Sequence, residues 1–116
     1  MKHILVCEDD ESILEVLKII LEDQGYRVTA WSYCNDFETI RNARPDLLLV
    51  DLWFQELGGA TICSLVKSDP ELSTTPVIIV SASNDLAAVA EGVHADGHIS
   101  KPFNIQDIVD TVKKLV

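Results

Sequence analysis

The sequence predicts an α/β fold in which a parallel sheet of five strands is covered by helices on both faces. Short apolar runs alternate five times with amphipathic segments along the 116 residues. Runs such as 47–50 and 77–80 are continuously hydrophobic, which is typical of strands that are buried on both faces. Because no repeat, low-complexity segment or linker interrupts this alternation, we expect a single domain over residues 1–116.

The first elements have the clearest boundaries. Residues 4–7 form a continuous apolar strand. Residues 12–24 carry branched apolar side chains at helical spacing, begin with the S-x-x-E pattern of a capping box, and are followed by Gly25, a natural helix stop. Residues 26–31 then alternate apolar and polar side chains, which indicates an edge strand.

The middle of the chain repeats the pattern. Residues 36–44 form a weaker helical segment that Pro45 closes. Residues 47–50 give the second fully buried strand. Residues 61–68 have apolar side chains at helical spacing, and the Asp-Pro pair that ends at Pro70 terminates this helix.

The last elements complete the alternation. Residues 77–80 form a buried strand, and Asn84 or Asp85 caps the helix that follows. A short strand over 98–100 leads to a final amphipathic helix over 105–116. Five strands and five helices in this order fit the flavodoxin-like, doubly wound arrangement with strand order 2-1-3-4-5. In such sheets the functional residues lie beyond the carboxyl ends of the strands.

Composition excludes several classes of function. The chain has 19 acidic and 9 basic residues, which gives a formal net charge of −10. This balance argues against direct binding of nucleic acid, whose phosphates are neutralised by Lys and Arg, and against an electrostatic membrane anchor. The apolar runs are far shorter than the roughly 18 residues of a membrane span. The first residues of the sequence meet an acidic cluster after a few apolar positions, so we do not expect them to form a signal peptide. Three widely spaced cysteines predict reduced thiols, so we expect a cytoplasmic protein.

Chemically active side chains follow four of the predicted strands. They are, in chain order, Glu8, Asp9, Asp10, Asp51, Ser81 and Lys101. Each alone has an ordinary structural explanation, and Asp10 is equally well placed to cap the following helix. Together they converge on one edge, where adjacent carboxylates repel by several kcal/mol at an effective dielectric of about 20 and require a cation. Oxygen ligands of this kind suit Mg²⁺, whereas a flavin phosphate site would need backbone donors and hydroxyls after the first strand.

Four motifs give the chain a resemblance to the receiver domain of two-component response regulators. They are I-L-V-C-E-D-D over 4–10, P-D-L-L-L-V-D over 45–51, P-V-I-I-V-S-A over 76–82 and K-P-F over 101–103. Each motif is moderately specific, and all four in this order on a chain of this length are highly specific. The resemblance covers the whole chain.

The resemblance implies a metal site and a phosphoacceptor. Asp51 would take a phosphoryl group from a phosphohistidine on a sensor histidine kinase or a histidine phosphotransfer protein. Asp9, Asp51 and the backbone carbonyl of Trp53 would ligate Mg²⁺, with Glu8 acting through a metal-bound water. The chain would then be a signalling switch and no enzyme, catalysing only its own phosphorylation and dephosphorylation.

The resemblance also implies how phosphorylation is sensed. Ser81 and Lys101 would bind phosphoryl oxygens, and the inward movement of Ser81 would bias the surface of the fourth helix, fifth strand and fifth helix. Receivers often form homodimers through this surface. His98 stands where the family usually has Tyr or Phe, so one hypothesis is an altered, pH-sensitive switch and the other is a surface histidine without a role. In the family the positions of Trp53 and Ser83 tune dephosphorylation, and we expect the bulky Trp53 to slow it.

Other departures leave alternatives open. Gln55 replaces the proline that is usual in the loop after Asp51, while Gly59 remains where a turn glycine is expected. A pseudo-receiver that binds a partner without phosphorylation is the second hypothesis. A phosphatase with an aspartate nucleophile is the third, but it would need Asp-x-Asp after the first strand. The output is not visible, so the chain is either a receiver from a longer regulator or a single-domain regulator.

Overall fold

Strands and helices alternate throughout the computed structural model, which describes residues 1–34, 36–55 and 57–116. The strands are β1 (His3–Cys7), β2 (Arg27–Trp31), β3 (Leu47–Asp51), β4 (Val77–Ser81) and β5 (Gly97–Ser100). The helices are α1 (Glu11–Asp23), α2 (Phe37–Ala43), α3 (Gly59–Ser68), α4 (Leu86–Gly92) and α5 (Ile105–Leu115). Every predicted element is present, and most boundaries differ from the prediction by one or two residues.

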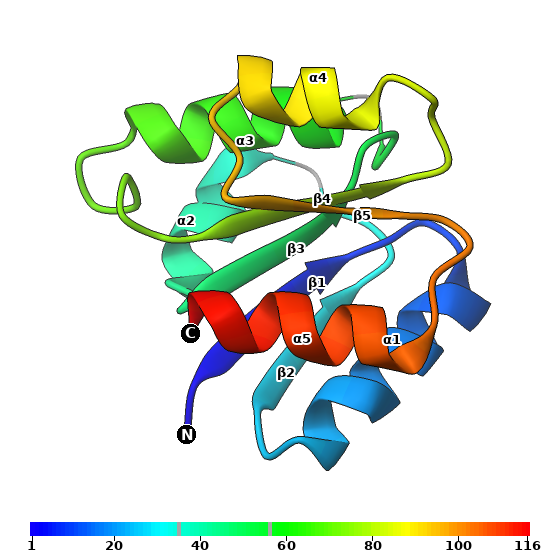
Figure 1. Cartoon of the computed structure of the whole chain (residues 1–116). Helices are drawn as coiled ribbons and strands as arrows, with labels where there is room; N and C mark the ends of the chain where they lie inside the picture. The colour runs from blue at the N-terminus through cyan, green and yellow to red at the C-terminus, as the bar shows by residue number, and fades with distance from the viewer. Residues whose placement is uncertain (35, 56) are drawn as a thin grey trace.

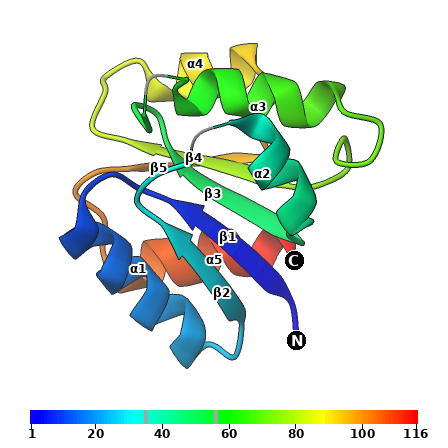
Figure 2. The same cartoon turned by 180° about the vertical axis from the view of Figure 1, so that it is seen from behind.

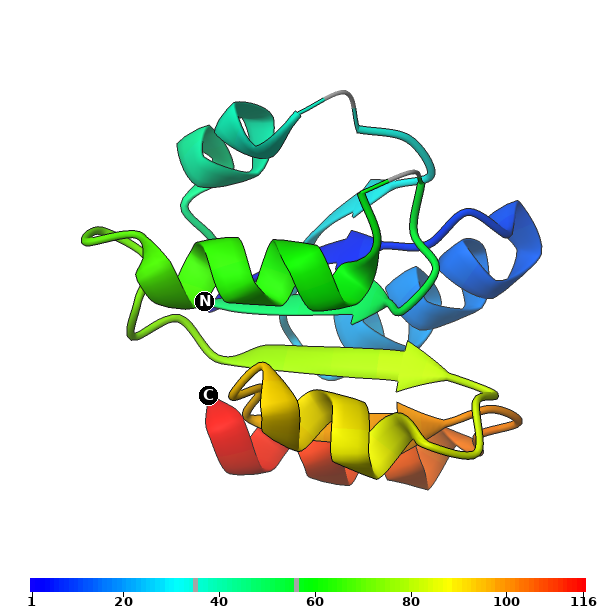
Figure 3. The same ribbon diagram turned by 90° about the horizontal axis from the view of Figure 1, so that it is seen from above.

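The sheet has the predicted topology. All neighbouring strands are parallel, in the order β2-β1-β3-β4-β5. Helices α1 and α5 cover one face, and α2, α3 and α4 cover the other (Figures 1 and 2). Figure 3 shows α3 and α4 over the second face, with β4 visible between them. Each face of the sheet therefore has its own hydrophobic core.

The three central strands, β1, β3 and β4, are buried along their whole length. Because successive side chains of a strand point to opposite faces, Leu5 and Leu48 pack under α2, α3 and α4, whereas Ile4 and Leu47 pack under α1 and α5. Burial on both faces explains why these strands read as continuous apolar runs. The edge strand β2 is only partly buried, in agreement with its alternating sequence.

The register of the parallel strands aligns their carboxyl ends. Cys7 pairs with Val50, Asp51 pairs with Val80, and Ser81 pairs with Ser100. The residues that end or directly follow β1, β3, β4 and β5 therefore meet at one edge of the sheet. The N- and C-termini lie at the opposite edge (Figure 1).

Helix α1 begins differently from the prediction. Its N-cap is Asp10, whose carboxylate accepts hydrogen bonds from the backbone N–H groups of Ser12 and Ile13 at 2.9 and 3.1 Å. The capping box predicted to start at Ser12 is therefore wrong, and Asp10 is assigned to the helix cap. A capping box does occur at α5, where Asn104 and Asp107 bond reciprocally.

The three cysteines are free thiols, as predicted. Cys7 and Cys63 are buried, and burial raises the pKa of both thiols, that of Cys63 to about 11. Neither thiol ionises near neutral pH, so both act as small apolar core residues. Within residues 1–34, 36–55 and 57–116, no helix is long and apolar enough to cross a membrane.

Candidate functional site

An ammonium group lies between two buried carboxylates at the carboxyl edge of the sheet. The Nζ atom of Lys101 is 2.7 Å from Oε1 of Glu8 and 2.8 Å from Oδ1 of Asp51. Glu8 and Asp51 are 3% and 8% exposed, so their charges require this partner. Burial by itself lowers the pKa of Lys101, but hydrogen bonds and Coulombic attraction from Asp51 and Glu8 outweigh burial and raise it. Lys101 therefore stays charged and neutralises the site.

The loop that follows β3 is folded tightly around Asp51. The backbone N–H of Trp53 donates to Oδ2 of Asp51 at 3.0 Å, and the N–H of Gly59 donates to the carbonyl of Leu52 at 2.7 Å. Gly58 has a φ of 81°, so the turn conformation that favours glycine is there rather than at Gly59. Gly59 is required for another reason: a Cβ at this position would lie 2.5 Å from the carbonyl oxygen of Asp51.

Asp9 is held by a different partner. The backbone N–H of Gln55 donates to Oδ1 and Oδ2 of Asp9 at 3.2 and 3.3 Å, and its Nε2 donates to Oδ1 at 3.2 Å. The same Nε2 donates to the carbonyl of Ser32 at 3.0 Å. The sequence predicted Asp9 beside Glu8 and Asp51, whereas among the described residues its carboxylate accepts hydrogen bonds from Gln55 in the loop after β3.

The donors at this edge suit a hard divalent cation by their chemistry. Carboxylates of Asp9 and Asp51 both border the loop after β3, whose backbone includes the carbonyl of Trp53, and oxygen ligands of this kind favour Mg²⁺. In the part of the chain that the structure describes, no group of three or more His, Cys, Asp or Glu side chains is gathered closely enough to hold a metal ion. The ligand roles of Glu8, Asp9, Asp51 and Trp53 therefore stay predictions.

Ser81 ends β4 beside Asp51, as predicted. Its side chain is buried, and its Oγ accepts a hydrogen bond from the N–H of Ser83 at 3.0 Å. The hydroxyl of Ser83 donates to Asp85. The N–H of Lys101 donates to the carbonyl of Ser81 at 2.9 Å, so the ends of β4 and β5 are joined next to the carboxylates.

Trp53 and His98 both face outward. The Trp53 side chain is 70% exposed and lines a hollow together with Ser83 and Val89. His98 is exposed on β5 and lines a shallow hollow with Thr111 of α5. These positions are compatible with tuning and switch roles, which also stay predictions.

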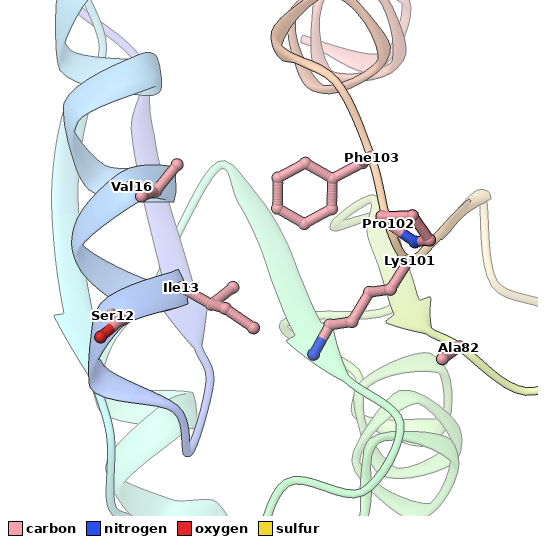
Figure 4. Close-up of a pocket in the computed structure, with 7 residues that line it drawn as sticks. All are labelled: Ser12, Ile13, Val16, Ala82, Lys101, Pro102 and Phe103. Atoms are coloured by element: carbon pink, nitrogen blue, oxygen red, sulfur yellow. The ribbon is translucent and has the colours of Figure 1, made fainter.

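An apolar groove of about 550 Å³, which sequence reasoning missed, lies beside the site. It separates α1 from the loop after β5, and its lining is Ser12, Ile13, Val16, Ala82, Lys101, Pro102 and Phe103. Figure 4 shows Phe103 on the side facing Val16 and the Lys101 side chain extended along the groove toward the end of β3. Val16, one of the apolar residues at helical spacing in α1, is 47% exposed at the wall of this groove. The closeness of Phe103 to Lys101 in the sequence is the signal from which an apolar surface beside the site could have been predicted.

Comparisons with known proteins agree with the fold. A model of the response regulator receiver domain matches residues 4–113. The Transcriptional regulatory protein CseB of Streptomyces coelicolor is 33% identical over 117 residues, which cover 98% of this chain and 49% of that protein. The DNA-binding response regulator MtrA of Mycobacterium tuberculosis is 32% identical over 115 residues, covering 97% and 49%. The chain spans about half the length of these curated relatives.

Solved structures agree at the level of the fold. A response regulator receiver domain protein from Clostridium thermocellum has a TM-score of 0.87 at 26% identity, covering 99% of this chain and 94% of that one. The chemotaxis protein CheY4 of Vibrio cholerae has a TM-score of 0.86 at 23% identity, covering 100% and 99%. The doubly wound fold with an acidic edge and a bridging lysine defines a class of signalling domain. The chain belongs to the response regulator receiver domain family.

Proposed function

We propose that this receiver domain accepts a phosphoryl group on Asp51 from a phosphohistidine of a partner histidine kinase or phosphotransfer protein, in a reaction that requires Mg²⁺. Phosphorylation would then switch the surface of α4, β5 and α5. The observation that carries the proposal is the ammonium group of Lys101, which lies 2.8 Å from Asp51 at the end of the central strand β3. The domain acts as a switch and turns over no substrate of its own.

The chemistry needs little beyond positioning and charge. An Asp51 oxygen attacks the phosphorus, the phosphorus–nitrogen bond of the donor breaks, and the imidazole nitrogen leaves with the electron pair. Lys101 balances the negative charge of the transferred group, and the Ser81 hydroxyl donates to one of its oxygens. Mg²⁺, held by Asp9, Asp51 and the Trp53 carbonyl with Glu8 acting through water, would supply further positive charge at the same oxygens.

The surroundings of the site favour a protein as phosphodonor. The groove between α1 and the loop after β5 is mostly apolar, and one of its walls is Lys101. An apolar helix face seated there would bring a histidine toward Asp51. The net charge of −10 argues that the receiver itself holds no nucleic acid, whichever output it controls.

Labelling with a small phosphodonor tests the proposal. We expect acetyl phosphate or phosphoramidate to form one acyl phosphate per chain in the presence of Mg²⁺, and chelation of Mg²⁺ to abolish it. Sensitivity of the label to hydroxylamine, followed by mass spectrometry, identifies the acyl phosphate and its peptide. A chain that stays unlabelled at saturating donor and Mg²⁺ would instead be a phosphorylation-independent interaction module.

The lifetime of the acyl phosphate is expected to depend on Trp53. Its indole is exposed and lines a hollow together with Ser83. We infer that the indole restricts the access of water to the acyl phosphate on Asp51. Trp53→Ala should speed the decay of the label about threefold to tenfold, or roughly 0.7–1.4 kcal/mol in activation free energy. Tyr33→Ala, which removes another exposed aromatic side chain, is the control. Equal decay rates for Trp53→Ala and the wild type would refute the screening role.

A further inference from the structure

Gln55 connects three loops at the carboxyl edge of the sheet. Its backbone N–H and its side-chain Nε2 both reach the Asp9 carboxylate in the loop after β1, and Nε2 also reaches the Ser32 carbonyl in the loop after β2. Gln55 itself lies in the loop after β3, where its φ of 52° is in the left-handed region that few residues other than glycine adopt. These contacts therefore hold the residue in an unfavoured backbone conformation.

The hydrogen bonds to Asp9 occupy the atoms that a metal ion would use. A carboxylate has about four lone-pair positions, and Gln55 makes three contacts with the two oxygens of Asp9 at 3.2–3.3 Å. Glu8 and Asp51 are bonded to Lys101 instead. The carboxylates of this edge are thus divided between two donors, and Asp9 is drawn toward the loop.

We propose that Gln55 is a positioning residue that holds Asp9 against the loop and thereby weakens the binding of Mg²⁺. The inference rests on the proposed function, because the role of Asp9 as a Mg²⁺ ligand is part of that proposal. Transfer of Asp9 from Gln55 to the metal loses hydrogen bonds to a charged group, and this loss opposes metal binding. A proline, which has no N–H and no side-chain donor, could make none of these contacts with Asp9.

Two variants separate the contacts. Gln55→Gly keeps the backbone N–H, tolerates the positive φ and removes only the side-chain donor. Gln55→Pro removes every donor. We expect the Kd for Mg²⁺ to fall about threefold to tenfold in Gln55→Gly and at least as far in Gln55→Pro. Gln106→Ala, which removes an exposed Gln–Asp hydrogen bond on α5, should leave the Kd unchanged.

Binding is measured by titrating Mg²⁺ into the unphosphorylated chain, by isothermal calorimetry and by intrinsic tryptophan fluorescence, to which Trp53 beside Asp51 and Trp31 both contribute. A purely structural role for Gln55 predicts the opposite sign, because a loosened loop would bind the metal more weakly. An unchanged or raised Kd in Gln55→Gly overturns the inference, and if Gln55→Pro fails to fold, Gln55→Gly decides alone. If the inference is overturned in this way, Mg²⁺ binding and labelling of the wild type would still support the proposed function. If the wild type and both variants bind no Mg²⁺, the inference and the proposed metal site both fail.

Discussion

Asp51→Asn is expected to abolish acyl phosphate formation completely, because an amide nitrogen or oxygen cannot replace the carboxylate as the attacking group. The comparison with Glu8 makes this result informative. Both carboxylates are buried and both bond to Lys101, at 2.8 and 2.7 Å. Asp51 differs from Glu8 because it is the end residue of β3, and Ser81 ends the adjoining strand β4. The second carboxylate oxygen of Asp51 accepts a hydrogen bond from the N–H of Trp53.

The matched variant is Glu8→Gln, which should retain the label at a lower rate because it leaves the attacking group in place. Asp23→Asn, at the far end of α1, is the neutral control for the loss of one acidic charge. All chains are incubated with the same phosphodonor and Mg²⁺, and the label is quantified by mass spectrometry. Label that persists in Asp51→Asn and disappears in Glu8→Gln would move the phosphoacceptor to Glu8.

Gly59→Ala is expected to lower the free energy of unfolding by about 2–4 kcal/mol, a large effect for the addition of one methyl group. The new Cβ would lie 2.5 Å from the carbonyl oxygen of Asp51 and 3.0 Å from the Cα of Leu52. Both are backbone atoms at the end of a buried strand, so neither can rotate away. The start of α3 would have to move, and with it the loop that positions Asp51.

Urea unfolding measures this loss, with Gly92→Ala as the control. Gly92 ends α4, and an added Cβ there meets no atom within 4 Å. Because alanine restricts the unfolded chain and favours the helix, Gly92→Ala should be neutral or stabilising by up to about 1 kcal/mol. Equal stabilities for the two variants would contradict the close approach of Gly59 to Asp51.

The sequence predicted the strands better than the starts of the helices. The strands β1, β3 and β4 are buried on both faces, so nearly every residue in them is apolar and the signal is strong. The start of α1 was misplaced because Ser12 and Asp10 are both good capping residues, and only the loop geometry selects Asp10. The start of α3 lies two residues earlier than predicted, because contact with the end of β3 rather than helix propensity determines it.

The site was predictable to the extent that strand ends define it. In a parallel sheet the residues after successive strands must share an edge, and this rule brought together Glu8, Asp51, Ser81 and Lys101. The rule says nothing about which loop a flexible carboxylate faces. The contacts of Asp9 depend on the left-handed backbone of Gln55, 46 residues away in the sequence, and no local pattern predicts them.

The bond between Lys101 and Glu8 joins residues 93 positions apart and so has a consequence for the newly made protein. Glu8 and Asp51 leave the ribosome long before Lys101, and until that lysine arrives they have no ammonium group to neutralise them. The nascent chain cannot bury this edge favourably, so we expect it to be unreactive toward phosphodonors during synthesis. Under the proposed function, phosphorylation would thereby be confined to chains in which β5 has docked.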